Sequence, residues 1–249
     1  MATSGCGGSA IDGATFVGQR DSRAIPRGVV MVPIPRLRVD GYNTSGMFPQ
    51  VYANSVNLVR VNHALRAAIT GDEDRYRSIA SAWRERLRGP NGPRPLTAGV
   101  YRLTLDRQLL SASSITVSVL LHSKRGIDQN DITNSWLGIT VDAATGSRVG
   151  ITQLFRGSVG LRAFGAAWRA VVLRRNPCPR GYPSMYASTP HNFRDFALVR
   201  GGIAAGVTEV GACGEIAATV PFSVVRKYLS ALGLRLVAGV RRPTAIRVA

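Results

Sequence analysis

The chain has 249 residues, of which 45% are hydrophobic and 18% are charged, a balance typical of globular proteins and not of disordered ones. No stretch approaches the roughly 20 consecutive apolar residues that a membrane-spanning helix requires, so we expect no transmembrane segment. The formal net charge of +18 favours polyanionic partners, such as nucleic acid, teichoic-type polymers, anionic lipid or acidic proteins.

Arginine supplies almost all of this positive charge, because Lys124 and Lys227 are the only lysines. The arginines are scattered along the chain in singles and pairs, without a run of five or six. This is the electrostatic footprint of a nucleic-acid-binding protein without any of its motifs. An arginine excess beside abundant Ala, Gly and Val is also what a GC-rich genome produces, so both interpretations stay open.

Residues 1–50 are rich in Gly, Pro, Ser and Arg and predict an extended arm, with room for one edge strand near Val29–Val32. No apolar segment before residue 28 is long enough for a signal peptide. However, Ser4-Gly5-Cys6-Gly7 is similar to the start of a mature bacterial lipoprotein. Cys6 is therefore a candidate lipidation site and the arm a secretory or lipoprotein-type linker; an ordinary small-residue tail is the alternative.

Residues 51–148 form the predicted N-terminal α/β part, which begins with two helices. The first follows the capping residues Asn54-Ser55 and ends at Gly71; the second begins at Asp72-Glu73-Asp74, where the helix dipole favours carboxylates. The apolar stripes of the two helices are Leu58, Val61, Leu65 and Ala68, then Tyr76, Ile79, Trp83 and Leu87. Period-two alternation then predicts strands over 101–106, 115–121 and 137–141, the last opening a hairpin at Ala144–Gly146.

Residues 149–233 form the predicted C-terminal part and 234–249 a basic tail. A helix starts near Ser158, two or three short strands cover 193–199, 203–207 and 216–220, and a last helix runs from Pro221 to Gly233. The predicted order is α-α-β-β-β-α-β-β-β-α. Because the strands come in runs, the sequence predicts an α+β fold with antiparallel sheets and packed helices.

The sequence contains no motif for a nucleotide, a metal or a nucleophile, so we predict no catalytic, cofactor-binding or metal-binding residue. Cys178 and Cys213 are candidates for a disulfide, and two unrelated buried thiols are the alternative. Cys178 with His191 is the only cysteine–histidine pair worth naming for catalysis. We expect Asp142 to be solvated at a strand end. Core packing is the expected role of Trp83, Trp136 and Trp168.

Three segments resemble a known family. They are Asn192-Phe193-Arg194-Asp195-Phe196 with Gly202-Ile203, Val220-Pro221-Phe222-Ser223 with its helix, and Thr140-Val141-Asp142 through Gly146 to Leu154-Phe155. Together they are similar to the extracytoplasmic domain of RsiV-type anti-sigma factors, which the mycobacterial secreted immunogenic antigen shares. The resemblance covers roughly residues 50–232 and implies this fold in a secreted or surface-anchored bacterial protein, with no catalytic residue to carry over.

Two differences between this sequence and the family concern the identity of the binding partner. The segment from Gly201 to Gly214 is shorter than in the family and holds small residues such as Ala204 and Ala205. One branch of the family binds lysozyme, but lysozyme is strongly basic and a +18 chain repels it at long range. Charge therefore disfavours lysozyme as the partner of this chain.

The resulting expectation is a non-enzymatic binding or effector protein, extracellular or anchored on the outer face of a bacterial membrane. Its expected partner is an anionic envelope polymer or a protein, with no cofactor. A cell-envelope hydrolase or carbohydrate-modifying enzyme is one alternative, because relatives are fused to deacetylases. An arginine-rich nucleic-acid-binding protein is the other.

Overall fold

The computed structural model of the protein describes residues 28–34, 42–52, 55–87, 99–127, 132–175, 183–207 and 216–241. One sheet contains, in spatial order, β1 (Val29–Pro33), β2 (Tyr42–Val51), β3 (Gly99–Ala112), β4 (Thr116–Gly126), β5 (Ile132–Asp142) and β6 (Ser147–Arg148). A second sheet contains β7 (Phe196–Val199), β8 (Gly202–Val207) and β9 (Ile216–Pro221). The helices are α1 (Val56–Leu87), α2 (Gly157–Arg175), α3 (Phe222–Val225) and α4 (Ala231–Arg241), with 3-10 turns η1 (Ile151–Leu154), η3 (Pro183–Tyr186) and η5 (Arg226–Tyr228).

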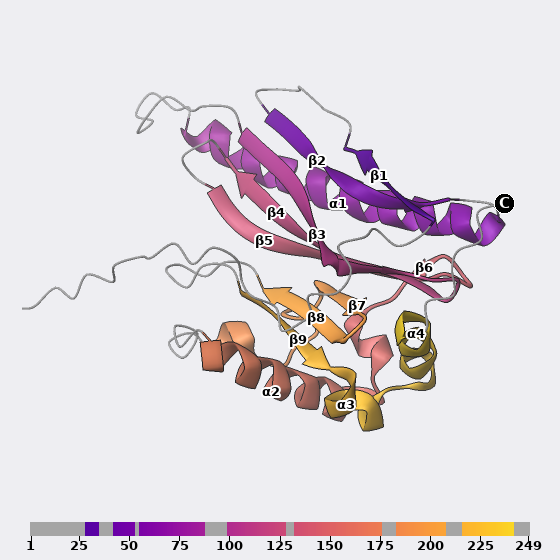
Figure 1. Cartoon of the computed structure of the whole chain (residues 1–249). Coiled ribbons are helices and arrows are strands. Elements are labelled where there is room, and N and C mark those ends of the chain that lie inside the picture. Colours follow the sequence, from indigo (N-terminus) through magenta and orange to yellow (C-terminus); the bar gives the residue numbers. More distant parts are fainter. Residues whose placement is uncertain are drawn as a thin grey trace, which may run out of the picture.

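The elements stack in layers. Helix α1 crosses one face of the six-stranded sheet, the three-stranded sheet packs against the other face, and α2 lies beyond the second sheet (Figure 1). All strand pairs are antiparallel except β2 with β3, which run in parallel and are joined by α1 as the crossover. The predicted α+β class with largely antiparallel pairing is confirmed. Within the described residues, no helix combines the length and the apolar character needed to cross a membrane.

Strand β4 is buried on both faces because it lies between two hydrophobic layers. Val117, Val119 and Leu121 belong to the cluster under α1, whereas Leu120 belongs to the cluster between the sheets. Successive side chains of a strand point to opposite faces, so one strand serves both layers. The alternation of apolar residues in the sequence revealed only the face under α1.

Small residues let the two sheets approach closely. A Cβ atom on Gly138 of β5 would overlap the backbone of Asp195 and Phe196, and one on Gly206 of β8 would overlap the ring of Trp136. Polar groups also connect the sheets across this interface: the Ser118 hydroxyl accepts the Leu198 N–H at 2.7 Å. The sheet contact therefore combines glycine clearance with hydrogen-bonded hydroxyls, as buried polar groups require.

The prediction of two helices ending and starting at Gly71 is wrong, because α1 is one helix of 32 residues. At 1.5 Å per residue it is about 48 Å long. A glycine inside a helix lowers stability by only ~1 kcal/mol relative to alanine. Packing on both sides of Gly71, by Leu65 and Ile69 before it and Ala80 after it, outweighs that cost.

The second predicted stripe on α1 is only partly correct, because Tyr76 packs against the core under α1 but two other members do not. Ile79 and Trp83 are about half exposed, whereas Glu73, Ala80 and Arg84 are buried. Glu73 accepts a hydrogen bond from Arg77 at 2.7 Å, and Arg84 donates to the Ile127 carbonyl oxygen at 2.6 Å. The expected core role therefore holds for Trp136 and Trp168 but not for Trp83.

The C-terminal region differs from the predicted helix over 221–233. The chain makes the short α3 and η5, an isolated bridge between Phe155 and Leu229, and then α4, which begins before the predicted basic tail and continues into it as far as Arg241. A Cβ atom on Gly233 would overlap the Leu154 carbonyl oxygen, so Gly233 is a packing position inside α4 and not its end. Several other predictions match: β1 is an edge strand, the 144–146 turn opens the β5–β6 hairpin, and α2, β8 and β9 lie where expected, whereas β7 begins at Phe196 and not at Phe193. The strands β1 and β2 both contain residues of the predicted 1–50 arm.

Candidate functional site

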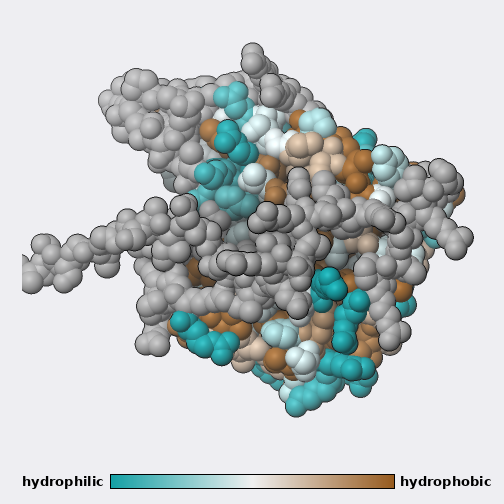
Figure 2. Space-filling view, in the orientation of Figure 1, coloured by the Kyte–Doolittle hydropathy of each residue, from teal (hydrophilic) through white to brown (hydrophobic). Residues whose placement is uncertain are grey.

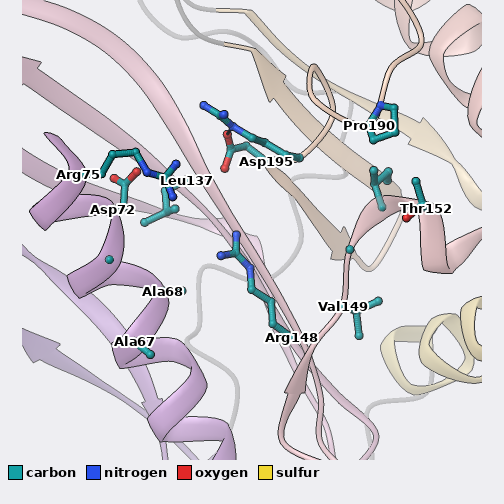
Figure 3. A pocket seen from close by; sticks show the side chains of 14 residues that line it. Ala67, Ala68, Asp72, Arg75, Leu137, Arg148, Val149, Thr152, Pro190 and Asp195 are labelled. Carbon is teal, nitrogen blue, oxygen red and sulfur yellow. Dashed lines mark hydrogen bonds and ion pairs between the residues drawn. The ribbon is translucent and has the colours of Figure 1, made fainter. Parts of the chain in front are cut away.

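A cavity of about 580 Å³ lies where α1, the chain around β6 and the turn before β7 meet. Alanines of α1 (Ala67 and Ala68) and Leu137 of β5 form part of its wall. Five charged residues line it: Asp72, Arg75, Arg148, Arg194 and Asp195. Figure 3 shows Asp72 and Arg75 on α1 at one side, Asp195 opposite, and the Arg148 side chain reaching into the space between them. Segments from three distant parts of the sequence therefore bring their charges to one place.

Asp72 is held by donors from the sheet. One of its carboxylate oxygens accepts a hydrogen bond from the Tyr101 hydroxyl at 2.8 Å. The same oxygen forms an ion pair with Arg125 at 2.6 Å. Burial, together with the Asp72 charge, raises the pKa of Tyr101 far above its usual value, so this hydroxyl remains a donor. Arg125 also lies over the Tyr76 ring, 5.9 Å from its centroid. Asp72 is thus neutralised inside the protein.

Asp195 is held in the same way on the opposite wall. Its Oδ1 accepts the Gly138 N–H at 3.0 Å, and its Oδ2 pairs with Arg194 Nε at 3.3 Å. Burial raises the pKa of Asp195, while the Gly138 and Arg194 donors oppose that shift. The carboxylate is therefore a structural acceptor between β5 and the turn before β7.

The two remaining guanidinium groups are not neutralised by the described carboxylates. Among the described residues, Arg148 donates only to a neutral acceptor, the Gly138 carbonyl oxygen, at 2.8 Å. Arg75 is exposed and makes no ion pair with any described residue. Asp72 pairs with Arg125, which does not line the cavity, and Asp195 pairs with Arg194, so no described carboxylate balances the charges of Arg75 and Arg148. Guanidinium groups in this state bind carboxylate or phosphate oxygens, often through two parallel hydrogen bonds.

The candidate residues of the sequence lie elsewhere. Cys6, Cys178 and Cys213 fall outside the described residues, so the lipidation, the disulfide and the cysteine–histidine pair stay predictions. His191 and His63 are exposed. Among the described residues, no group of three or more His, Cys, Asp or Glu side chains could hold a metal ion.

The interpretation of two acidic residues requires correction. Asp72 lies in the middle of α1, so it does not complement a helix dipole but pairs with Arg125. Asp142 was expected to be solvated, but its side chain is only 7% exposed and pairs with Arg235 of α4. Sequence reasoning missed Arg75 and Arg148 altogether. The nearest signal was Arg194-Asp195, which lies inside the segment that carries the family resemblance.

No protein-family model and no curated protein matches the sequence. Among solved structures, a DUF3298-family protein from Bacteroides fragilis is similar, with a TM-score of 0.56 and 10% identity over 86% of this chain and 96% of the other. A DUF3298-family protein from Pseudomonas aeruginosa is similar with a TM-score of 0.51 and 10% identity, over 83% of this chain and 96% of the other. At this identity the likeness concerns the fold alone. The chain thus has the fold of DUF3298-family proteins, which are related to RsiV-type extracellular domains.

Proposed function

We propose that this chain is an RsiV-like, non-enzymatic binding protein on the outside of a bacterial cell, and that it binds an anionic component of the cell envelope in the cavity beside α1. The ligand chemistry is a phosphate or carboxylate group on an envelope polymer. The binding groups are the guanidinium groups of Arg75 and Arg148.

One observation carries this proposal. The cavity's two carboxylates are each satisfied by donors within the protein, whereas Arg75 and Arg148 have no carboxylate partner among the described residues. An anion entering the cavity would meet two positive charges and no uncompensated negative one. The net charge of +18 adds a long-range field that speeds association with such a ligand.

The same geometry favours binding over bond-making. A general acid or base needs a carboxyl group free to exchange a proton with a substrate. Asp72 is occupied by Tyr101 and Arg125, and Asp195 by Gly138 and Arg194. Their hydrogen bonds hold the walls of the cavity in place, which suits a preformed binding site.

The test uses poly(glycerol phosphate) and oligogalacturonate as probes in calorimetric titrations of the full chain. The double variant Arg75→Gln/Arg148→Gln should bind one of these probes at least tenfold more weakly, because each lost guanidinium removes a charge-assisted hydrogen bond. Arg174→Gln/Arg200→Gln removes the same charge from exposed positions outside the cavity and should change the affinity less than threefold. Equal losses in both double variants would show that diffuse charge and not the cavity binds the polymer.

Nucleic acid presents the same phosphate chemistry and is the competing interpretation. A double-stranded DNA oligonucleotide titrated at several salt concentrations separates the two cases, because phosphate contacts on DNA give a steep dependence on salt. Tighter binding to DNA than to poly(glycerol phosphate) near physiological ionic strength would favour the nucleic-acid function and contradict the envelope ligand.

A further inference from the structure

A second cationic site lies at the opposite end of the molecule from α1, around α3 and η5. A shallow groove there has a volume of about 730 Å³. It is lined by Arg156, Arg226 and Lys227, by Ser223, and by two aliphatic residues, Val224 and Leu234. None of the described residues that line it is acidic. Figure 2 shows hydrophilic residues beside hydrophobic ones at the end of the molecule where Figure 1 places α3.

Arg156 is fixed in place by the backbone. Its N–H donates to the Tyr228 carbonyl oxygen at 2.8 Å, and its Nε donates to the Leu229 carbonyl oxygen at 2.9 Å. These bonds orient the side chain through one nitrogen and leave the two terminal nitrogens of the guanidinium group for another acceptor. Holding the group in one orientation before binding lowers the entropy lost when an anion arrives.

The aliphatic residues of the groove are exposed. Val224 is 48% exposed and Leu234 is 37% exposed. Val159, three residues beyond Arg156 in the first turn of α2, is 55% exposed. Apolar side chains interspersed with arginine and lysine are typical of surfaces that lie in the interface of a membrane, where the cations meet lipid phosphates and the aliphatic groups enter the acyl boundary.

We infer that the surface formed by Arg156, Arg226, Lys227, Val224 and Leu234 docks on an anionic lipid bilayer. Charge complementarity selects the phosphate-bearing headgroups, and the exposed valine and leucine favour a bilayer over a soluble polyanion, which has no apolar phase. This inference is independent of the cavity beside α1, because no described residue lines both the cavity and the groove.

The experiment is co-sedimentation of the full chain with vesicles of phosphatidylcholine and phosphatidylglycerol at 3:1, compared with pure phosphatidylcholine vesicles. Val224→Ser/Leu234→Ser keeps the net charge and should reduce the partition coefficient on mixed vesicles about tenfold, because less apolar surface leaves water. Arg226→Gln/Lys227→Gln should reduce it by roughly twentyfold at low salt, since each cation near an anionic surface contributes about fivefold.

The matched control is Arg174→Gln/Arg66→Gln. It removes two exposed cations away from the groove; Arg174 is about 26 Å along the axis of α2 from Gly157, the residue after Arg156. This control should change the partition coefficient less than threefold. Thermal unfolding of each variant verifies that the fold is intact, which is expected because all the substituted side chains are exposed.

Two results would overturn the inference. If Val224→Ser/Leu234→Ser bound mixed vesicles as wild type does, the attraction would be diffuse electrostatics without docking. The second result would be that wild type does not bind the vesicles but binds inorganic phosphate, and that Arg226→Gln/Lys227→Gln loses this phosphate binding. The groove would then hold a soluble phosphate group instead. Arg75→Gln/Arg148→Gln should leave vesicle binding unchanged. The membrane-docking inference and the proposed anion site in the cavity can therefore fail independently of each other.

Discussion

Gly138 and Asp195 hold the two sheets together at the edge of the cavity. The Gly138 N–H donates to Asp195 Oδ1 at 3.0 Å, and the lack of a side chain on Gly138 is what allows the backbone of Asp195 and Phe196 to lie against β5. The carbonyl oxygen of the same glycine accepts the hydrogen bond from Arg148. One residue without a side chain thus positions an acid and a cation of the candidate site.

Asp195→Asn should leave the protein at least as stable as wild type at pH 7, whereas Asp195→Ala should lower the free energy of unfolding by about 1–3 kcal/mol. The asparagine can still accept the Gly138 N–H, but the alanine leaves that buried donor unsatisfied. Urea unfolding at pH 7 measures both. Equal destabilisation by the two substitutions would show that the charge itself, and not the acceptor, is required.

The raised pKa of Asp195 also predicts a pH dependence. Because burial raises the folded pKa above the unfolded one, the stability linked to this group is present below about pH 4 and is lost as the pH rises through the folded value. The difference in unfolding free energy between wild type and Asp195→Asn should therefore shift in favour of the variant between pH 4 and pH 7. A constant difference across this range would contradict the shift.

For the ion pair between Asp142 and Arg235, the pH dependence of stability has the opposite sign to that of Asp195. Burial alone would raise the pKa of Asp142, but hydrogen bonds from Arg235 and from the Ala144 N–H hold it below its ordinary value. The stabilisation is therefore present above about pH 4 and is lost as the pH falls through the folded pKa. Asp142→Asn should cost ~1 kcal/mol at pH 7, a modest value because the Arg235 side chain is 43% exposed, and nothing at pH 2–3. Urea midpoints at the two pH values check this, with Arg174→Gln as the control.

Tyr101→Phe should lower stability by about 1 kcal/mol at pH 7, because Asp72 loses one donor while the ring remains buried. The raised pKa of Tyr101 means that its stabilising contribution is complete below pH 10 and declines as the pH rises above that value. Wild type should therefore lose stability between pH 10 and pH 12 faster than the variant. Tyr228→Phe, at a half-buried position, is the control and should keep the wild-type slope.

Two glycine substitutions should have opposite effects on stability. Gly206→Ala places a methyl group into the Trp136 ring at the sheet interface and should destabilise the protein by about 1–3 kcal/mol. Gly71→Ala meets nothing within 4 Å and should stabilise it by roughly 0.5–1 kcal/mol through the higher helix propensity of alanine. Thermal unfolding of both variants is the measurement. A destabilised Gly71→Ala variant would contradict the continuous α1 helix.

Local periodicity was enough to predict the α+β class, the runs of antiparallel strands, the 144–146 turn and α2, because each depends on neighbours within a few residues. It could not decide where α1 ends. Gly71 weakens a helix locally, and only packing of residues on both sides against the sheet keeps the helix continuous. The same packing buries Glu73 and Arg84 and leaves Ile79 and Trp83 exposed.

The charge balance of the candidate site was decided entirely by tertiary structure. Net charge alone indicated an anionic partner, but it could not say which arginines are neutralised. Asp72 takes its partner from 53 residues further along the chain, and the Asp195 carboxylate is fixed by Gly138, 57 residues earlier. Electrostatic attraction depends on distance in space and not in sequence, so only the fold determined that Arg75 and Arg148 have no carboxylate partner among the described residues.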